Sequence, residues 1–283
     1  MKDTHRPLRR TFHSTNGRVA WDRLGSGPPV VLMHGTPFSS YVWREFAEAL
    51  SGEHTVHLWD MPGFGQSEMR AGQDVSLPGQ QHVFTELLDH WGLLDTPPAV
   101  IAHDIGGAIA LRTALLGGVR FDRLALIDVV ALSPWGSPFF QLINQEAEVF
   151  EALPPHMHKG LIRSYIETAS HRGPRPEVMG KLLEPWLTAE GQAAFYRQIA
   201  QADTRDTEEV ERRLHELSSL PVSVMWGAED SWIPPDRAEK LATLIPGAKV
   251  HFLRDSGHLV QEDAPARLAA LLVTFLAGHG GER

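Results

Sequence analysis

The chain has 283 residues, of which 42% are hydrophobic and 22% charged, and its formal net charge is −9. This length and composition suit one large globular domain, and the acidic balance argues against nucleic-acid binding. The chain has no cysteine, which excludes disulfides and thiolate chemistry. No apolar run approaches the roughly 20 residues of a membrane span, and the first residues lack the apolar segment of a secretory signal. We therefore expect a cytoplasmic protein with no membrane partner.

Short apolar strands and helices are predicted to alternate through the first half of the chain. Strands are predicted at residues 18–24, 30–33, 55–60, 99–102 and 124–128, and helices at 41–50, 80–93 and 107–116. Short buried strands separated by helices are typical of a parallel sheet with helices on its faces. The fold class indicated is therefore α/β.

The alternation is interrupted in the middle of the chain. Residues 133–216 contain helical patterns cut by several prolines and no short strand-like run. The alternation then resumes, with strands at 222–226 and 249–253 and helices at 236–244 and 264–276. We predict a core made of residues 1–132 and 217–283, with a helical cap at 133–216 near the carboxyl ends of the strands, where ligands bind in such folds.

The segment Val-Ile-Ala-His-Asp-Ile-Gly-Gly-Ala at residues 100–108 predicts a sharp turn from a strand into a helix, with Asp104 at its apex. The flanking residues Ala102 and Gly106 are small, as a strained apex requires, and Gly107 lets the helix pack close to the strand. Asp104 would lie at a helix N-terminus, where free N–H groups and the helix dipole favour a negative charge. We expect its carboxylate to be ionised and nucleophilic near neutral pH.

Taken alone, this pattern also fits an ordinary strand–turn–helix connection with Asp104 as its N-cap. Two later segments favour a catalytic interpretation. Asp230 follows the predicted strand at 222–226, and His258 follows the predicted strand at 249–253. Asp230 would hold His258 in the tautomer that a general base needs. Nucleophile, acid and histidine then occur in the chain order of the α/β-hydrolases.

The chain resembles the α/β-hydrolase fold family over essentially its whole length. It is most similar to the branch with an aspartate nucleophile, which contains epoxide hydrolases and haloalkane or haloacetate dehalogenases. The matching segments are His34-Gly35-Thr36-Pro37, Asp60-Met61-Pro62-Gly63-Phe64-Gly65-Gln66-Ser67, the turn at Asp104, Asp230 and Gly257-His258. The resemblance implies a mostly parallel central sheet flanked by helices, with an inserted helical cap.

The resemblance also implies roles for single residues. The backbone N–H groups of Thr36 and Ile105 map to the oxyanion donors, and the peptide bond before Pro37 is expected to be cis. Asp230 matches the family's acid, with Asp128 as a reserve, because some haloalkane dehalogenases place their carboxylate after the strand that precedes the cap.

An aspartate nucleophile restricts the chemistry. A carboxylate is poorly suited to attack an ester or amide carbonyl, since the product would be an anhydride, but it can displace a leaving group at saturated carbon. Such a reaction leaves an alkyl ester on Asp104. His258 would then activate a water molecule to hydrolyse that ester, while the oxyanion donors stabilise the charge on its carbonyl oxygen.

The leaving group divides this branch. An opening epoxide needs a proton donor, and tyrosine, with an ordinary pKa of about 10, can serve. A leaving halide needs N–H donors instead. Haloalkane dehalogenases carry Trp directly after the nucleophile and usually Asn after His-Gly, where this chain has Ile105 and Thr36. Haloacetate dehalogenases usually carry Arg after the nucleophile, and many epoxide hydrolases carry Trp, so Ile105 departs from all three groups.

Three aromatic residues of the predicted cap are candidates for contacting the substrate. Tyr196, followed by Arg197, resembles the Tyr-Arg pair that bears one of the two ring-opening tyrosines of epoxide hydrolases. Tyr165 is the other candidate, although it lies further from the nucleophile than the family spacing suggests, and Phe150 is an alternative occupant of that place. Trp135 is a candidate for lining the pocket. Each of these also fits a packed aromatic of the cap core.

The sequence thus predicts a hydrolase that opens an epoxide to a diol through an ester on Asp104. The first alternative is a haloalkane or haloacetate dehalogenase, with Trp135 or Trp186 as halide donors. The second is a non-catalytic, ligand-binding relative. We expect a small, largely apolar substrate and neither an organic cofactor nor a metal, because nucleophile, base and orienting acid are all side chains. The sequence does not fix the oligomeric state.

Overall fold

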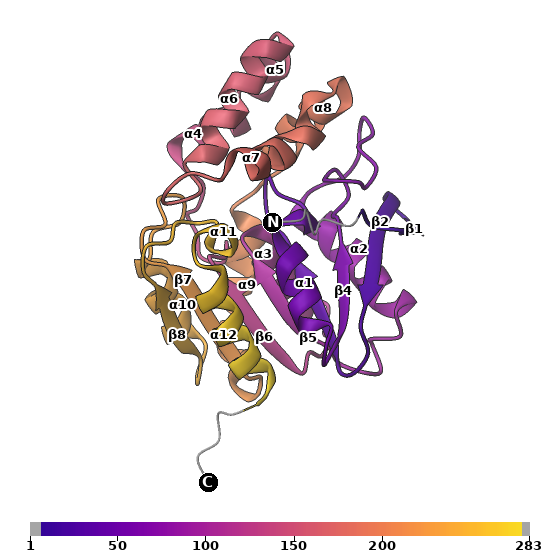
Figure 1. The fold of residues 1–283 in the computed structure, drawn as a ribbon, viewed down its shortest axis with the longest axis vertical. Coiled ribbons are helices and arrows are strands. Elements are labelled where there is room, and N and C mark those ends of the chain that lie inside the picture. The colour runs from indigo at the N-terminus through magenta and orange to yellow at the C-terminus, as the bar shows by residue number, and fades with distance from the viewer. Residues whose placement is uncertain (1–6, 279–283) are drawn as a thin grey trace.

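An eight-stranded sheet forms the centre of the structure (Figure 1), a computed structural model that describes residues 7–278. The strands are β1 (Arg10–Ser14), β2 (Gly17–Leu24), β3 (Pro29–Met33), β4 (Thr55–Trp59), β5 (Ala99–His103), β6 (Arg123–Ile127), β7 (Val222–Gly227) and β8 (Lys249–Leu253). Their order across the sheet is β1-β2-β4-β3-β5-β6-β7-β8. Strand β2 is antiparallel to both of its neighbours, and all other neighbouring pairs are parallel.

The strand order reverses direction between β3 and β5. The chain passes from β3 to β4 on one side and later returns to β5 on the other. In open α/β sheets, ligands bind outside the carboxyl ends of the strands at such a reversal. Thr36 lies shortly after the end of β3, and Asp104 directly follows β5, so the sheet brings these two predicted site residues to the same crevice.

The predicted strands are confirmed with small shifts at their ends, but β1 was not predicted. The central strand β5 is buried along its whole length, which explains its continuous apolar sequence. Strand β1 is instead mostly exposed, with no fully buried residue, and forms a hairpin with β2 at the sheet edge. Its sequence Arg-Thr-Phe-His-Ser therefore lacks the apolar signal on which strand prediction depends.

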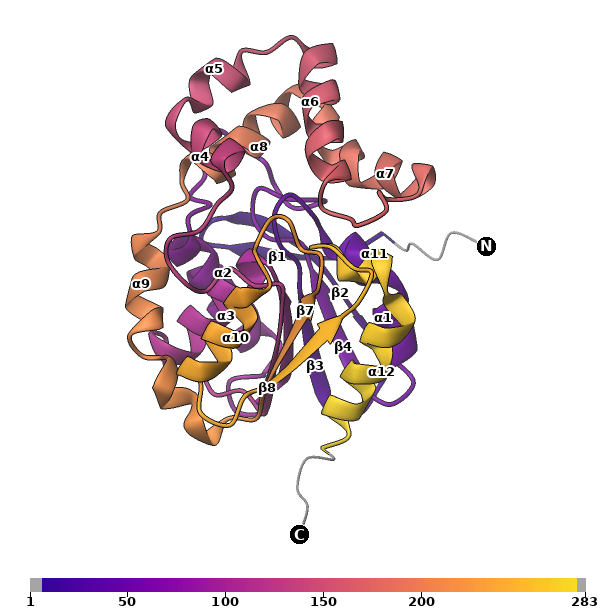
Figure 2. The ribbon, with the colours of Figure 1, turned by 90° about the vertical axis from the view of Figure 1, so that its left-hand side faces the viewer.

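Helices cover both faces of the sheet (Figures 1 and 2). One face carries α1 (Arg44–Leu50), α11 (Val260–Asp263) and α12 (Pro265–Leu276), and the other carries α2 (Leu77–His90), α3 (Ile105–Leu115), α9 (Arg205–Glu211) and α10 (Asp236–Leu244). Three short 3₁₀ helices are η1 (Ser40–Trp43), η2 (Glu184–Leu187) and η3 (Leu214–Ser219). Helix α2 begins earlier than the predicted residue 80 because Ser76 caps it, its hydroxyl accepting the N–H of Gly79.

Five helices lie above the carboxyl ends of the strands, at the top of Figure 2. They are α4 (Pro138–Gln145), α5 (Ala147–Glu151), α6 (Pro155–Glu167), α7 (Pro176–Leu183) and α8 (Ala189–Ala200). Prolines that interrupt the sequence pattern begin α4, α6 and α7, where the missing N–H costs nothing. Helix α9 packs instead against the core helix α3. We propose that the cap predicted at 133–216 ends with α8 and that the chain then returns along the core.

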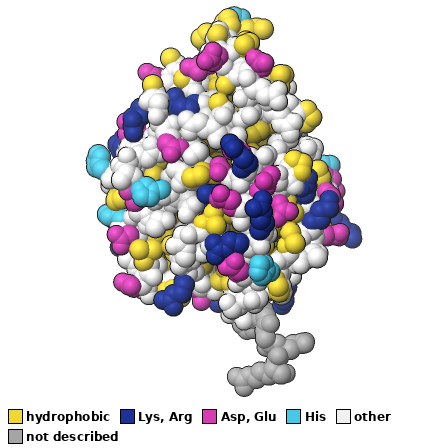
Figure 3. Space-filling model, turned by 180° about the vertical axis from the view of Figure 1, so that it is seen from behind, with side chains coloured by type: hydrophobic (Ala, Val, Ile, Leu, Met, Phe, Trp, Pro, Cys, Tyr) yellow, Lys and Arg dark blue, Asp and Glu magenta, His cyan; other side chains and the backbone are white. Residues whose placement is uncertain are grey.

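The surface mixes charges of both signs. On the face opposite to that of Figure 1, basic and acidic side chains lie among one another (Figure 3). Exposed ion pairs such as Lys240–Asp236 and Arg213–Glu216 follow this pattern, and pairs of this kind contribute little to stability. Within residues 7–278, no helix combines the length and apolar character needed to cross a lipid bilayer.

Candidate active site

Asp104 stands at the apex of the turn between β5 and α3. Its backbone has φ 53° and ψ −125°, a region that is sparsely populated for a residue other than glycine. The two glycines behind it are required by close packing. A Cβ on Gly106 would lie 2.5 Å from the carbonyl oxygen of His34, and one on Gly107 would lie 2.2 Å from Val129 Cγ1. The expected strained turn is therefore present. Both glycines allow the first turn of α3 to pack closely against the backbone of His34 and the side chain of Val129.

The Asp104 carboxylate is held by backbone donors on one side and faces an imidazole on the other. The backbone N–H of Thr36 donates to Asp104 Oδ1 at 2.7 Å, and that of Ile105 also donates to this carboxylate. Asp104 Oδ2 lies 3.4 Å from His258 Nε2. Burial opposes ionisation of Asp104, but the hydrogen bond and charge of His258 outweigh it and hold the pKa below its usual value. Asp104 is therefore an anion at neutral pH.

His258 lies between two carboxylates. Its Nδ1 is 2.9 Å from Asp230 Oδ2, and the other Asp230 oxygen accepts the backbone N–H groups of Trp232 and Ile233 at 2.7 and 3.0 Å. Complete burial acts to lower the pKa of His258, but the charges of Asp230 and Asp104 and their hydrogen bonds raise it well above its ordinary value. The imidazole is thus protonated at neutral pH while Asp104 carries its charge.

Asp128, the reserve acid, is present in the same cluster but has a different state. It is fully buried, and its Oδ1 accepts the backbone N–H of Gly227 at 2.8 Å. Burial first, and then the charge of Asp230, raise the pKa of Asp128 well above its ordinary value. Asp128 is consequently a neutral acid, and Asp230 is the carboxylate that contacts His258.

Asp128, Asp230 and His258 each present one potential metal ligand, and these atoms lie within 4.8 Å of one another. Asp230 and the Nδ1 of His258 already satisfy each other through their hydrogen bond. A protonated Asp128 accounts for the third member, since its O–H can donate to Asp230. The hydrogen-bonded network thus explains this trio, and we do not propose a metal there.

Replacing Asp128 with Asn should leave the protein at least as stable as the wild type near neutral pH. An amide reproduces both hydrogen bonds of the protonated acid, accepting from Gly227 and donating to Asp230. In the unfolded chain Asp128 ionises above about pH 3.9, whereas the folded chain retains the proton. The wild type therefore loses stability as the pH rises from that value, and the Asn variant does not.

This prediction is checked by urea unfolding at about pH 4 and about pH 8. The advantage of Asp128→Asn should be present at the higher pH and small at the lower one. Asp128→Ala is the contrasting variant. It removes the donor to a buried carboxylate, which costs about 1.5–3 kcal/mol. Equal stability of the Asn and Ala variants at the higher pH would contradict a protonated Asp128.

A small cavity of about 30 Å³ lies over Asp104. Its walls are mostly apolar and come from both the core and the cap: Thr36, Asp104, Ile105, Val130, Trp135, Gly136, Ser137, Phe140, Tyr165, Trp232 and Ile233. Two of the three predicted cap aromatics, Tyr165 and Trp135, therefore lie beside the carboxylate. The cavity can take a small reacting group in a water-poor environment, where electrostatic interactions are strong.

The two tyrosines predicted to meet the substrate are placed differently. Tyr165 lines the cavity, and its hydroxyl makes no hydrogen bond to the part of the chain that the structure describes. Tyr196 is fully buried and is not among the residues that line the cavity. Its hydroxyl lies 2.8 Å from His158 Nδ1 on helix α6. The structure therefore brings Tyr165, and not Tyr196, to Asp104.

The indole N–H groups around the site are already engaged. Trp135 Nε1 donates to Thr207 Oγ1 at 2.8 Å, Trp186 Nε1 donates to the Pro37 carbonyl at 2.9 Å, and Trp232 Nε1 donates to Thr168 Oγ1 at 2.9 Å. Donors committed to oxygen atoms of the protein are not free to bind a halide. The halide role considered for Trp135 and Trp186 thus has no support in this arrangement.

Two contacts were not predicted from the sequence. The Trp232 ring is stacked between His258, at 5.0 Å between ring centroids, and Tyr165, at 4.3 Å. Gln198 on α8 accepts a hydrogen bond from the Thr36 hydroxyl. Trp232 stands two residues after Asp230, so its place in the acid loop was a usable signal. Gln198 lies in a helix far along the chain, and nothing in its neighbourhood pointed to Thr36.

The cap is also tied to the turn after β3. The peptide bond between Thr36 and Pro37 is cis, as the resemblance implied. His158 Nε2 is 2.9 Å from the Trp186 carbonyl while its Nδ1 meets Tyr196, so Tyr196, His158, Trp186 and Pro37 form one connected series of hydrogen bonds. Burial lowers the pKa of His158, which keeps its ring neutral. This series explains the position of Tyr196 without a role in the cavity.

Comparison with known proteins places the chain in a family. Residues 30–271 match the model of the alpha/beta hydrolase family, and the chain therefore belongs to that family. It is 28% identical to haloalkane dehalogenase 2 of Mycobacterium tuberculosis over 273 residues, which cover 93% of each chain. It is 25% identical to a cis-3-alkyl-4-alkyloxetan-2-one decarboxylase of Shewanella oneidensis, with 98% of this chain and 91% of that protein covered.

Solved structures agree with this assignment. An alpha/beta hydrolase fold protein from Burkholderia ambifaria is 42% identical, has a TM-score of 0.89 and is covered to 97%, against 94% of this chain. Haloalkane dehalogenase DbeA from Bradyrhizobium elkani has a TM-score of 0.78 at 20% identity, with 95% of this chain and 97% of that chain covered. The second likeness concerns the fold alone. Together with the dehalogenase relative, the family membership supports a hydrolase.

Proposed function

We propose that the protein is a hydrolase that acts at saturated carbon through a covalent ester on Asp104. The observation that carries this proposal is the orientation of the Asp104 carboxylate. Its Oδ1 already receives the Thr36 N–H, while Oδ2 lies on the side of His258. The nucleophile thus holds one of its own oxygens in the donor site, as expected if the ester formed on the enzyme is what is later hydrolysed.

The proposed reaction has two steps. First, Asp104 Oδ2 attacks the substrate carbon and displaces the leaving group, which leaves a neutral ester. Loss of this charge removes one of the two carboxylates that raise the pKa of His258, so the imidazole releases its proton more readily. Neutral His258 then takes a proton from a water molecule that attacks Asp104 Cγ, and the charge that develops on Oδ1 is stabilised by the N–H groups of Thr36 and Ile105. The bond between Cγ and the alkyl oxygen then breaks, and this oxygen takes the proton of the newly added hydroxyl and leaves as the alcohol. The Asp104 carboxylate and the protonated His258 are thereby restored.

Among leaving groups, the site favours an epoxide oxygen. Opening an epoxide produces an alkoxide that needs a proton, and Tyr165 places at the wall of the cavity a hydroxyl that makes no hydrogen bond to residues 7–278. Burial and then the charge of Asp104 raise the pKa of Tyr165, so the phenol remains protonated and able to donate. We therefore propose hydrolysis of an epoxide to a diol, with Tyr165 as the acid.

Dehalogenation is the second candidate. The observation in its favour is the similarity to haloalkane dehalogenase 2 over 93% of the chain. Against it stand the engaged indole N–H groups and the absence of Trp after the nucleophile, where Ile105 stands. A halide would have to be held by other groups. The choice between the two reactions is therefore made by a product assay.

Replacing Tyr165 with Phe should lower epoxide turnover by about 10²–10⁴-fold, the usual contribution of a positioned general acid. The measurement is diol formation from styrene oxide. Release of bromide from bromobutane, which requires no proton transfer, provides the comparison. Tyr196→Phe is the matched control, because it removes a hydroxyl that meets His158 outside the cavity, and it should change diol formation far less.

Each other outcome of the assay has a definite meaning. Loss of diol formation in Tyr196→Phe but not in Tyr165→Phe would assign the acid to Tyr196. Faster release of bromide than of diol by the wild type would make the protein a dehalogenase. Substrate binding with no product from either compound would favour the non-catalytic, ligand-binding alternative.

A further inference from the structure

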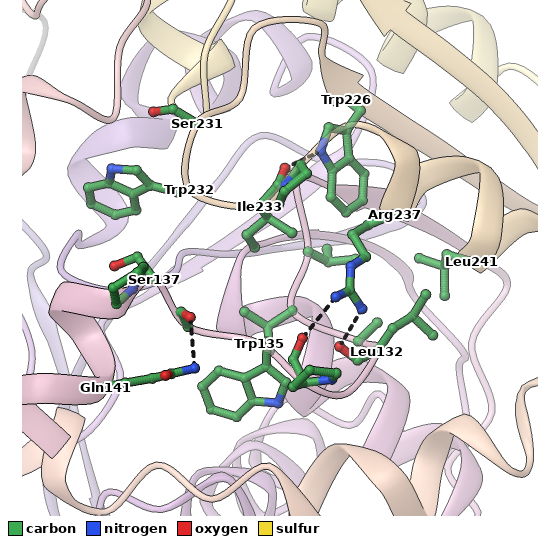
Figure 4. Close-up of a pocket in the computed structure, with 17 residues that line it drawn as sticks. Leu132, Trp135, Ser137, Gln141, Trp226, Ser231, Trp232, Ile233, Arg237 and Leu241 are labelled. Atoms are coloured by element: carbon green, nitrogen blue, oxygen red, sulfur yellow. Dashed lines mark hydrogen bonds between the residues drawn. The ribbon is translucent and has the colours of Figure 1, made fainter. Parts of the chain in front are cut away.

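A second and larger cavity adjoins the one over Asp104. Its volume is about 350 Å³ (Figure 4). The two cavities have several wall residues in common, namely Val130, Trp135, Gly136, Ser137, Trp232 and Ile233. The larger cavity is therefore within reach of a ligand whose reacting group fills the small cavity over Asp104.

The larger cavity has mixed walls, in which the polar side chains of Ser137, Gln141 and Ser231 lie among apolar ones. Leu132, Trp226 and Leu241 contribute apolar surface, and among the described residues Arg237 is the only charged one that lines it. In Figure 4 the guanidinium reaches across the cavity towards the backbone beside Trp135, where it donates to the carbonyls of Leu132 and Pro134 at 3.3 and 3.1 Å. A guanidinium has five N–H donors, so these bonds leave three.

Arg237 forms no ion pair in the described part of the chain, although it interacts electrostatically with the neighbouring, exposed Asp236. No Asp or Glu oxygen of residues 7–278 lies within ion-pair distance of its guanidinium, although the side chain is half-buried. The position of Arg237 in its helix is also unfavourable for a positive charge. Arg237 lies in the first turn of α10, where the helix dipole disfavours a cation. Its hydrogen bonds to the carbonyls of Leu132 and Pro134 compensate in part, and violations of such a local rule concentrate at functional positions.

We propose that this second cavity is a subsite for the carboxylate end of the substrate, with Arg237 as the group that binds it. The substrate would be an amphipathic carboxylic acid whose apolar chain lies along the cavity and whose electrophilic carbon is distant from the carboxylate. Guanidinium and carboxylate match in a two-pronged hydrogen bond. This inference deepens the proposed function and rests on it only for the placement of the reacting carbon at Asp104.

Binding of a non-reacting acid tests the subsite without any chemistry at Asp104. Octanoate and octanol are titrated at neutral pH, and the signal is the intrinsic fluorescence of Trp135, Trp226 and Trp232, which line the cavity. Octanoate should bind saturably to the wild type. Arg237→Gln should weaken octanoate binding about tenfold or more, because a charge-assisted hydrogen bond is lost, and should leave octanol binding unchanged.

Two further variants keep this test decisive. Arg163→Gln makes the same change of charge on the exposed side of α6 and should bind octanoate as the wild type does. Arg237→Lys keeps the positive charge and should retain part of the affinity for octanoate. If Arg237→Gln does not fold, the weaker octanoate binding of Arg237→Lys still tests the role of the guanidinium. Octanoate binding that is absent in the wild type, or that is equal in the wild type and in the folded Arg237 variants, would overturn the proposal.

The same protein samples separate this inference from the proposed function. Neutral epoxides could form an adduct on Asp104 while octanoate binding did not depend on Arg237. This result would retain the ester mechanism and reject the subsite. Octanoate binding that depends on Arg237, with neither diol nor halide ever produced, would retain the subsite and reject the chemistry.

Discussion

Replacing His258 with Gln is expected to stop the reaction after a single alkylation and to leave the substrate attached to Asp104. The first step needs only the carboxylate, whereas hydrolysis of the ester needs a base, and an amide cannot accept a proton at neutral pH. Turnover should fall by about 10²–10⁴-fold. Intact-mass measurement should show a gain equal to the mass of a whole epoxide, since ring opening releases no fragment.

Peptide mapping then locates the adduct. It should lie on the peptide that contains Asp104 and on no other. His82→Gln, a change of the same type on the exposed side of helix α2, should turn over normally and carry no adduct. Full turnover by the His258 variant, or an adduct on another side chain, would reject the two-step mechanism.

Replacing Asp104 with Asn should abolish product formation, with a loss of about 10⁴-fold or more, because the amide is not a nucleophile. Asn can keep the hydrogen bond from the Thr36 N–H, and it tolerates a positive φ better than most residues. The effect is therefore chemical rather than structural. In the double variant with His258→Gln, no adduct should form at all, which distinguishes Asp104 from every other candidate nucleophile.

The Asp104 variant also makes a pH prediction. The charges of Asp230 and Asp104 together hold the pKa of His258 above its ordinary value, so removal of the Asp104 charge should move this pKa downward. An NMR titration of the imidazole in wild type and variant measures the change. Asp89→Asn, on the exposed side of α2, is the control. An unchanged or raised His258 pKa would show that the two side chains are not electrostatically coupled.

The core of the site followed from the sequence because parallel strands bring their carboxyl ends to one edge of the sheet. Asp104 follows β5, Asp230 lies after β7 and His258 lies after β8, so a correct strand assignment was enough to place them together. The sequence could not choose firmly between Asp230 and Asp128, since both follow strand ends. Only burial and hydrogen-bond partners show that Asp128 is neutral and that Asp230 meets the histidine.

The cap could not be predicted in the same way. Its helices have no sheet to fix their order, and their packing depends on contacts between residues far apart in the chain. The sequence favoured Tyr196, which is followed by Arg197, over Tyr165. The structure favours Tyr165 instead, because His158 on α6 occupies the hydroxyl of Tyr196. The hairpin strand β1 was missed for a different reason, because an exposed edge strand needs no apolar pattern.

The hydrogen-bonded series from Tyr196 through His158 and Trp186 to Pro37, with the contact between Gln198 and Thr36, has a consequence for ligand exchange. The same short loop anchors the cap and supplies an N–H to the nucleophile. A movement that lifted α6 and α8 away from the strands would pull on this loop and would draw the Thr36 N–H away from Asp104. Opening of the cap would then lower the reactivity of the site, because an ester on Asp104 would lose a stabilising donor when the cap lifts.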